Sequence, residues 1–175
     1  AGRINREHLK EAFEWIDEEV EEKIGKNFYN RFGGNFFLDL DRLKKEDIDP
    51  RVIYDIVQNY LPKVEGIERM IYKEDIITSA ATDKITNRLQ NMIHPHKTPE
   101  IFPIVTKGYL YKSPYGTGHG SPYDYDTHVP LIFSHIQSQR VSNATPRATV
   151  DIAPTISQIL GVQIPEYCDG IAIQF

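Results

Sequence analysis

A loop rich in glycine, histidine and carboxylates runs directly into a continuous apolar segment, and this combination constrains the fold more than any other feature of the chain. The loop spans residues 116–128, and the apolar segment runs from Val129 to Phe133. A strand that is apolar on both sides normally lies inside a sheet, with neighbours on either side and both faces covered. Catalytic and binding groups concentrate in loops that such a rigid element carries. The sequence therefore predicts a layered domain with a functional loop next to a buried strand.

Helical and strand patterns alternate along the rest of the chain, with short connections between them. This order favours an α/β or α+β layered domain over a helix bundle or a β-sandwich. Asn5 is a plausible N-cap for the first helix, and Asp49 and Pro50 are suited to the start of the second. The sequence predicts helices over residues 6–24, 50–61, 82–93 and 150–160, and strands over 35–40, 66–72, 101–105 and 129–133.

Composition limits the classes of function. A chain of 175 residues fits one domain, and its net charge of −5 gives no general attraction to nucleic acid or to an anionic membrane. No apolar run approaches the ~20 residues of a membrane span. A single cysteine, Cys168, excludes an internal disulfide framework and is interpreted as inert.

His119 has the neighbours that a metal ligand needs. It lies between Gly118 and Gly120, and Asp124 and Asp126 follow within the same loop. Imidazole and carboxylate are the zinc ligands of choice where thiolates are absent, and Asp126 could accept the second ring hydrogen of His119. The residue types alone leave a second interpretation open, a tight turn with a hydrogen-bonded histidine and no ion. A catalytic zinc site needs about three protein ligands, so this site is incomplete within the chain.

The other histidines have weaker neighbourhoods. His8 has no partner at ligand spacing and is expected on the surface. His94 and His96 flank a proline at a helix end, which favours a polar turn over a metal pair. His135 follows the predicted buried strand and is expected to mark its exit into solvent.

Two spaced motifs resemble a known family. The segment from Gly116 to Phe133 is similar to the late metal-ligand loop of alkaline phosphatases of the PafA type, whose superfamily includes the nucleotide pyrophosphatase/phosphodiesterases. Asp151-Ile152-Ala153-Pro154-Thr155 resembles the Asp-Ile-Ala-Pro-Thr motif that follows in those enzymes, and Asp169-Gly170 resembles their C-terminal turn. The opening residues 1–4 resemble the segment just after the family's Asp-His ligands, whereas residues 6–104 match only as a pattern of elements.

The resemblance implies an α/β/α sandwich that holds two zinc ions and uses a threonine or serine nucleophile on phosphate esters. His119 would be a zinc ligand, while Asp126 and His128 would surround the ligands. Residues 1–104 would form a cap-like α+β insertion over the active site, and residues 105–175 the C-terminal part of the catalytic core. The nucleophile and the remaining ligands would lie upstream of Ala1, so no catalytic residue is expected in this chain, and the chain alone should be inactive.

Three functions stay open at this point. The first is a fragment of a zinc-dependent phosphomonoesterase, and the second a fragment of a phosphodiesterase or nucleotide pyrophosphatase. The third is a non-catalytic binding or interaction module that kept the fold. The resemblance suggests a periplasmic or extracellular protein, and an exposed edge at residues 129–133 suggests a dimer.

Overall fold

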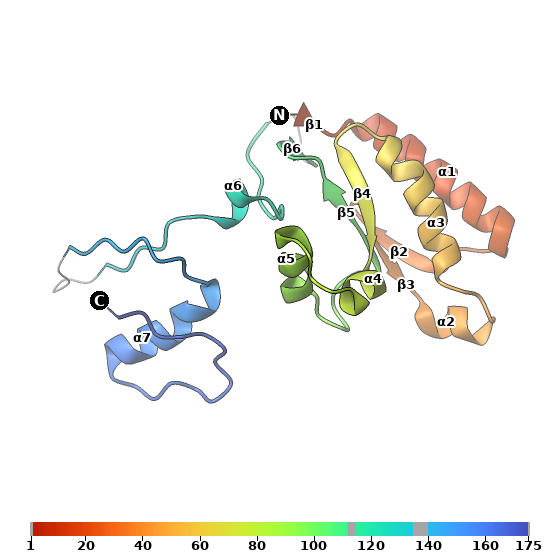
Figure 1. Cartoon of the computed structure of the whole chain (residues 1–175). Helices are drawn as coiled ribbons and strands as arrows, with labels where there is room; N and C mark the ends of the chain where they lie inside the picture. The colour runs from red at the N-terminus through yellow and green to blue at the C-terminus, as the bar shows by residue number, and fades with distance from the viewer. Residues whose placement is uncertain (1, 112–114, 135–139, 175) are drawn as a thin grey trace. The chain divides into compact units, whose positions relative to one another are not determined.

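A four-stranded antiparallel sheet lies at the centre of the first of two compact units, which span residues 1–128 and 129–175. The computed structural model describes residues 2–111, 115–134 and 140–174 (Figure 1). The inner strands of the sheet are β3 and β5, and its edges are β2 and β4. In spatial order the strands are β2 (Tyr29–Phe32), β3 (Asn35–Leu38), β5 (Ile101–Val105) and β4 (Ile67–Tyr72).

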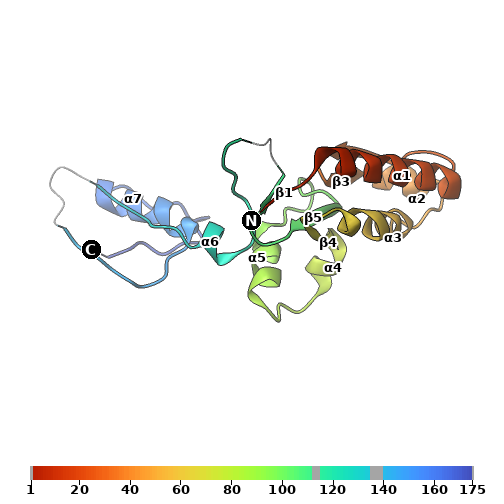
Figure 2. The same ribbon diagram turned by 90° about the horizontal axis from the view of Figure 1, so that it is seen from above.

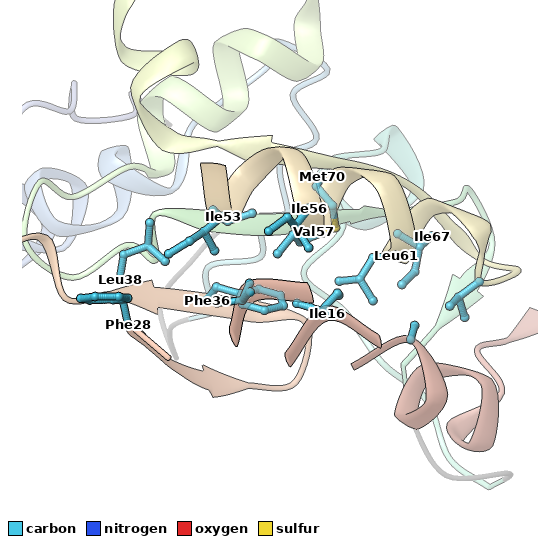
Figure 3. Packing of buried hydrophobic residues seen from close by; sticks show 14 of the residues in the cluster. Ile16, Phe28, Phe36, Leu38, Ile53, Ile56, Val57, Leu61, Ile67 and Met70 are labelled. Atoms are coloured by element: carbon cyan, nitrogen blue, oxygen red, sulfur yellow. The ribbon is translucent and has the colours of Figure 1, made fainter. Parts of the chain in front are cut away.

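Two helices, α1 (Arg6–Ile24) and α3 (Arg51–Tyr60), cover one face of this sheet (Figures 1 and 2). Ile16 of α1, Val57 of α3 and Phe36 of β3 are fully buried between them (Figure 3). A short 3-10 turn, η1 (Leu61–Lys63), continues α3 and adds Leu61 to the same cluster. Burial of such side chains stabilises each by about 1.5–3 kcal/mol relative to exposure, so this cluster is the main core of the unit.

The opposite face of the sheet carries a second, smaller cluster under α4 (Lys73–Thr78) and α5 (Lys84–Met92). Leu89 of α5 packs there against Phe102 and Ile104 of β5. Successive residues of a strand point to opposite faces, so Ile101 of β5 belongs to the main core while its neighbour Phe102 belongs to the second cluster. Strand β5 therefore holds both layers together.

The ends of the predicted helices agree closely with the structure. Asn5 caps α1, because its Oδ1 accepts hydrogen bonds from the backbone N–H groups of Glu7 and His8, and Gly25 ends the helix in the left-handed conformation at φ 78°. Helix α3 begins one residue later than predicted, at Arg51, whose backbone N–H donates to Asp49. The prediction of these helices is confirmed.

Several elements of the first unit were not predicted, among them β2, α2 (Leu40–Lys45) and α4. The strand predicted over residues 35–40 ends at Leu38, because the Asp39 carboxylate accepts a hydrogen bond from the backbone N–H of Arg42 and starts α2. Strand β2 is short and polar in part, and it depends on its pairing with β3, in which Tyr29 lies opposite Leu38. Tertiary pairing overrides the weak local pattern here.

A separate parallel pair joins the start of the chain to the end of the sheet-forming region. Strand β1 (Gly2–Arg3) pairs with β6 (Tyr109–Leu110), and the backbone N–H of Ile4 donates to the Leu110 carbonyl at 3.0 Å. Residues 5–108 thus leave and return at neighbouring strands. The described residues form a mixed α/β fold, and none of their helices is long and apolar enough to cross a membrane.

The second unit is built around α7 (Ile152–Leu160), which a 3-10 turn, η2 (Thr149–Asp151), precedes. The hydroxyl of the fully buried Thr155 donates to the Asp151 carbonyl at 2.5 Å and accepts from the backbone N–H of Ile173 at 2.9 Å. Gly161 ends the helix at φ 65°, as predicted. Hydrogen bonds rather than a large apolar cluster join α7 to the C-terminal segment.

The predicted buried strand over residues 129–133 is wrong. These residues form no strand, and the side chains of Val129 and Ile132 are 62% and 81% exposed. A strand exists only where a neighbour completes its hydrogen bonds, and Pro130 has no N–H to donate. Among the residues that the structure describes, no strand pairs with this segment. An apolar run favours burial, but most of this segment is exposed in the described structure.

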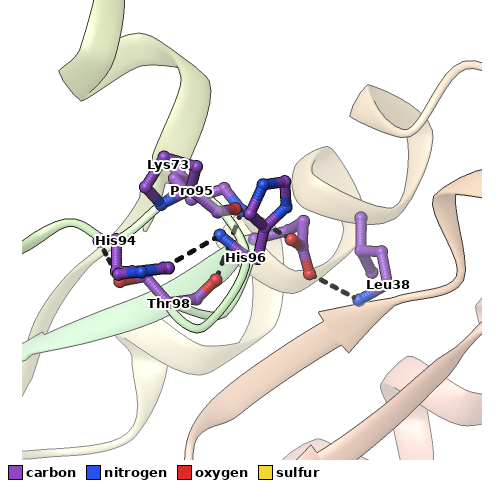
Figure 4. Close-up of polar contacts among 7 residues, drawn as sticks. Leu38, Lys73, His94, Pro95, His96 and Thr98 are labelled. Atoms are coloured by element: carbon purple, nitrogen blue, oxygen red, sulfur yellow. Dashed lines mark hydrogen bonds and ion pairs between the residues drawn. The ribbon is translucent and has the colours of Figure 1, made fainter.

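A buried ion pair fixes the turn between α5 and β5 (Figure 4). The Lys73 ammonium lies 2.7 Å from Glu100 Oε1 and also donates to the carbonyls of Pro95 and Thr98. Glu100 Oε2 accepts from the backbone N–H of Leu38 at 2.8 Å. The side chains of Lys73 and Glu100 are only 10% and 14% exposed. Each therefore compensates the charge of the other, which would be costly to bury alone.

We expect Lys73→Met to lower the free energy of unfolding of the first unit by about 3–5 kcal/mol, because it leaves the Glu100 carboxylate buried without its partner. Urea denaturation followed by circular dichroism measures the change. Lys10→Met, which removes an exposed pair with Glu14, is the matched control and should cost less than about 1 kcal/mol. An equal loss in the two variants would contradict the role assigned to the buried pair.

Candidate functional site

The loop that carries His119 leaves the end of β6 and ends in α6 (Asp124–Thr127). Its backbone turns at Gly116 and Gly120, with φ 95° and 99°, conformations that favour glycine. Arg3 Nη2 donates to the Gly116 carbonyl at 2.7 Å, so the loop is tied to β1 at its start. The His119 side chain is exposed between these turns.

Two tyrosines fix the far end of the loop to the sheet. The Tyr123 hydroxyl lies 2.7 Å from Glu68 Oε2 and 3.1 Å from the carbonyl oxygen of Val105. Burial, and then the Glu68 carboxylate, raise the pKa of Tyr123 to about 12, so the phenol stays protonated at neutral pH. The Tyr125 ring stacks on Tyr123 at 5.9 Å between centroids. The end of the loop is therefore attached to β4 and β5.

A guanidinium from α5 holds the same end of the loop. Arg88 Nη1 donates to the Pro122 carbonyl at 2.6 Å, and Nη2 donates to Asp124 Oδ1 at 2.7 Å. The hydrogen bond from Arg88 is the main cause that lowers the pKa of Asp124, and the nearby Lys84 charge adds to it. Asp124, one of the two carboxylates that follow His119 in the loop, thus pairs with Arg88 of α5.

Asp126 shapes the segment next to His119. Its Oδ2 accepts a hydrogen bond from the Ser121 backbone N–H at 2.6 Å, and this bond is the main cause that lowers the pKa of Asp126. Within the described residues no hydrogen bond joins Asp126 to His119. The carboxylate holds the loop backbone directly.

His128 lies at the end of α6, where its backbone N–H donates to the Asp124 carbonyl at 2.8 Å. Its side chain is exposed. Across residues 2–111, 115–134 and 140–174, no three His, Cys, Asp or Glu side chains come together as a group that could hold a metal ion. An assembled metal centre is therefore not part of what these residues form by themselves.

The His119 imidazole is suited to bind a zinc ion as one ligand of a larger site. His119 offers an exposed imidazole, a nitrogen ligand that zinc accepts. The loop around it is held at Gly116, Ser121 and Tyr123, which limits the positions that the ring can take. One imidazole falls short of the three protein ligands of a catalytic zinc site, so the other ligands would come from outside the residues that the structure describes.

The pair His94 and His96 forms a turn. The backbone N–H of His96 donates to His94 Nδ1 at 3.2 Å, and the backbone N–H of His94 donates to the Thr98 hydroxyl at 2.8 Å (Figure 4). The sequence favoured a polar turn here, and the Nδ1 lone pair of His94 is used within that turn. His8 is exposed on α1, and His135 lies outside the described residues.

The segment from Asp151 to Thr155 has a structural role in this chain. Asp151 accepts hydrogen bonds from the backbone N–H groups of Ile171 and Ala148, at 2.9 and 3.0 Å, and these bonds lower its pKa. A Cβ atom at Gly170 would collide with the backbone of Val150 and Asp151. The motif that begins at Asp151 and the Asp169-Gly170 turn, which both resemble the family, therefore lie against each other. The hydrogen bond from Ile171 to Asp151 joins them.

Comparison with known proteins adds the decisive observation. No family model matches the chain. Alkaline phosphatase PafA of Elizabethkingia meningoseptica is 26% identical over 158 residues, which cover 89% of this chain and 29% of the relative. Alkaline phosphatase PhoV of Synechococcus elongatus is 25% identical over 135 residues, covering 77% of this chain and 24% of the relative. This chain is distantly similar to the PafA and PhoV alkaline phosphatases.

The fold supports the same relation. The crystal structure of wild-type alkaline phosphatase PafA superimposes with a TM-score of 0.78 at 24% sequence identity, covering 99% of this chain and 33% of that chain. At this identity the likeness establishes the fold. The chain spans less than a third of the length of the relatives that it matches in sequence, and the mixed α/β structure corresponds to part of PafA.

The pKa of Asp151 gives the second unit a pH-dependent stability. Because hydrogen bonds lower the pKa of Asp151 in the folded state below the unfolded value of about 3.9, its contribution is present above that value and is lost as the pH falls through the folded pKa. We expect Asp151→Asn to speed amide exchange of Ile171 and Ala148 at pH 6, and the difference from wild type to shrink near pH 2.5.

The matched control for this prediction is Asp169→Asn, which changes an exposed carboxylate in the same unit. It should leave the exchange of both amides at the wild-type rate. Equal exchange rates in the two variants at pH 6 would contradict the role of Asp151.

Proposed function

We propose that this chain is part of a zinc-dependent phosphomonoesterase, to which it contributes one metal ligand, His119. The observation that carries the proposal is the exposed His119 ring on a loop that is held on both sides, in a chain similar to alkaline phosphatases over most of its length. Similarity to PafA and PhoV supports phosphate monoesters as the substrate class.

In this proposal bound zinc would activate the nucleophile and stabilise charge on the transferring phosphoryl group. The chain's own residues orient the ligand. Asp126 holds the Ser121 backbone beside His119, and Tyr123 and Arg88 hold the end of the loop against the sheet and α5. His128, whose backbone N–H donates to the Asp124 carbonyl, would lie beside the ligands rather than among them. The nucleophile, a threonine or serine, would lie in a segment of the complete protein that corresponds to the part of the relatives outside the match.

The proposal includes the division of the chain at residue 104 that the sequence predicts. The parallel pairing of β1 and β6 supports an excursion, residues 5–108, inserted between neighbouring strands of a larger sandwich. The sequence assigns the cap-like insertion to residues 1–104 and the C-terminal part of the core to residues 105–175, and we propose that β1, through its pairing with β6, belongs with the core. The enzyme would be an exported, periplasmic or extracellular protein. A phosphodiesterase fragment remains the alternative within the superfamily.

A non-catalytic binding or interaction module is the alternative from another class, and a dimer through residues 129–133 would be compatible with it. The well-packed core of the first unit is compatible with independent folding, and the exposed side chains of Val129, Leu131 and Ile132 offer an apolar surface. Such a module would bind a partner without hydrolysing phosphate esters. Activity of the protein encoded by the complete gene separates the two classes.

His119→Ala in the product of the complete gene should remove one bound zinc ion and lower kcat/KM for an aryl phosphate by about a hundredfold or more, because a ligand of the reacting centre is lost. Metal analysis and steady-state kinetics measure the two effects. His8→Ala, which changes an exposed histidine of α1, should keep both values. A fully active, fully metallated His119→Ala protein would contradict the proposal, and no hydrolysis by the wild type would favour the module.

The isolated chain of 175 residues should not hydrolyse an aryl phosphate, with or without added zinc, because one imidazole cannot form a catalytic zinc site. Release of the phenol, followed by absorbance, measures this. Zinc-dependent turnover by the purified chain that is lost in His119→Ala would overturn this expectation.

A further inference from the structure

Arg88 joins two parts of the chain that sequence analysis treats separately. It belongs to α5, within the predicted cap-like insertion, and its two donors reach Pro122 and Asp124 in the loop after β6. We propose that Arg88 is a positioning residue for His119 and couples the predicted insertion to the metal-ligand loop. The proposal rests on the proposed function of His119 as a zinc ligand.

The packing of α5 on the sheet fixes the position of the Arg88 backbone. Its neighbour Leu89 is 3% exposed and packs with Phe102 and Ile104 in the cluster beneath α5, and Tyr123 of the loop packs against the same cluster. Because this packing anchors α5, the position of the helix determines where the Arg88 guanidinium lies. Movement of α5 would therefore shift the acceptors in the loop together with Arg88.

The geometry of the guanidinium explains why an arginine is needed. Its planar group presents donors in a fixed arrangement, so one side chain can hold a carbonyl and a carboxylate at once. The distances of 2.6 Å to the Pro122 carbonyl and 2.7 Å to Asp124 Oδ1 agree with two such bonds. A lysine keeps the charge but lacks this arrangement, so it should restore the contact only in part.

A short series of contacts leads from Arg88 to the histidine. Pro122 directly follows Ser121, whose backbone N–H donates to Asp126 in the same turn of α6 as Asp124. Ser121 in turn lies two residues after His119. Release of Pro122 and Asp124 would thus loosen both sides of the hydrogen bond that shapes the backbone next to the imidazole.

Amide exchange in the chain as given tests the mechanical part. In Arg88→Ala, exchange of Ser121 and His128 should become about fivefold faster, which corresponds to the loss of roughly 1 kcal/mol of hydrogen-bond stabilisation. Arg88→Lys should recover part of the protection. Arg51→Ala is the matched control, because Arg51 forms a similar exposed pair between helices, with Asp75, away from the loop.

Metal binding in the product of the complete gene tests the coupling. Arg88→Ala should weaken zinc affinity in a chelator competition by about fivefold, and it should change the visible absorption of the cobalt-substituted protein, whereas Arg51→Ala should change neither. Asp124→Asn removes the charge of the partner with little change in shape. It should act in the same direction and serves as the test if Arg88→Ala fails to fold.

The outcomes separate the inference from the function on which it rests. If His119→Ala loses zinc while the folded Arg88→Ala and Asp124→Asn proteins keep wild-type exchange, affinity and absorption, the inference on Arg88 is wrong and the proposed function stands. If His119→Ala keeps all its zinc, the proposed function and the inference both fall. Equal effects of Arg88→Ala and Arg51→Ala would mean a general loss of stability and would also overturn the inference.

Discussion

The pairing of β1 with β6 is the contact on which the position of the His119 loop depends. It brings together two points of the chain about 100 residues apart, and the entropy of closing such a loop costs about 4 kcal/mol, which the core of the first unit must offset. The Tyr109 ring packs where Gly2 and Gly66 lack a Cβ atom. The loop with His119 begins directly after this pair, and Arg3 of β1 holds its first turn. The position of the proposed ligand therefore depends on the folding of the whole excursion between the two strands.

Much of the fold could be predicted because strong local signals agree with the tertiary structure. Asn5 and Gly25 delimit α1, and the short apolar run over residues 101–105 coincides with β5. Strand β2 and helix α4 escaped prediction because they depend on pairing and packing rather than on local pattern. The error at residues 129–133 has the opposite origin. An apolar run indicates a tendency to be buried, and without a neighbouring strand in the described structure it remains exposed.

The candidate site was located by residue type but its internal contacts were not. Glycines around His119 predicted a tight loop, and the positive φ values of Gly116 and Gly120 agree with that. Sequence suggested Asp126 as a partner of the His119 ring, whereas the carboxylate accepts from the Ser121 backbone. Arg88 lies 34 residues before its partner Pro122, and Glu68 lies 55 residues before Tyr123, so no local spacing connects them with the loop. Their contribution appears only when the sheet brings β4, β5 and α5 beside the loop.

The central claim is that His119 binds zinc in a metal-dependent phosphatase. Anomalous X-ray diffraction at the zinc edge, on crystals of the protein encoded by the complete gene, tests this most directly. The account predicts an anomalous peak at about 2.0–2.1 Å from a ring nitrogen of His119, the usual zinc–nitrogen distance. A protein with zinc bound at other residues, and with the His119 ring in solvent, would contradict it.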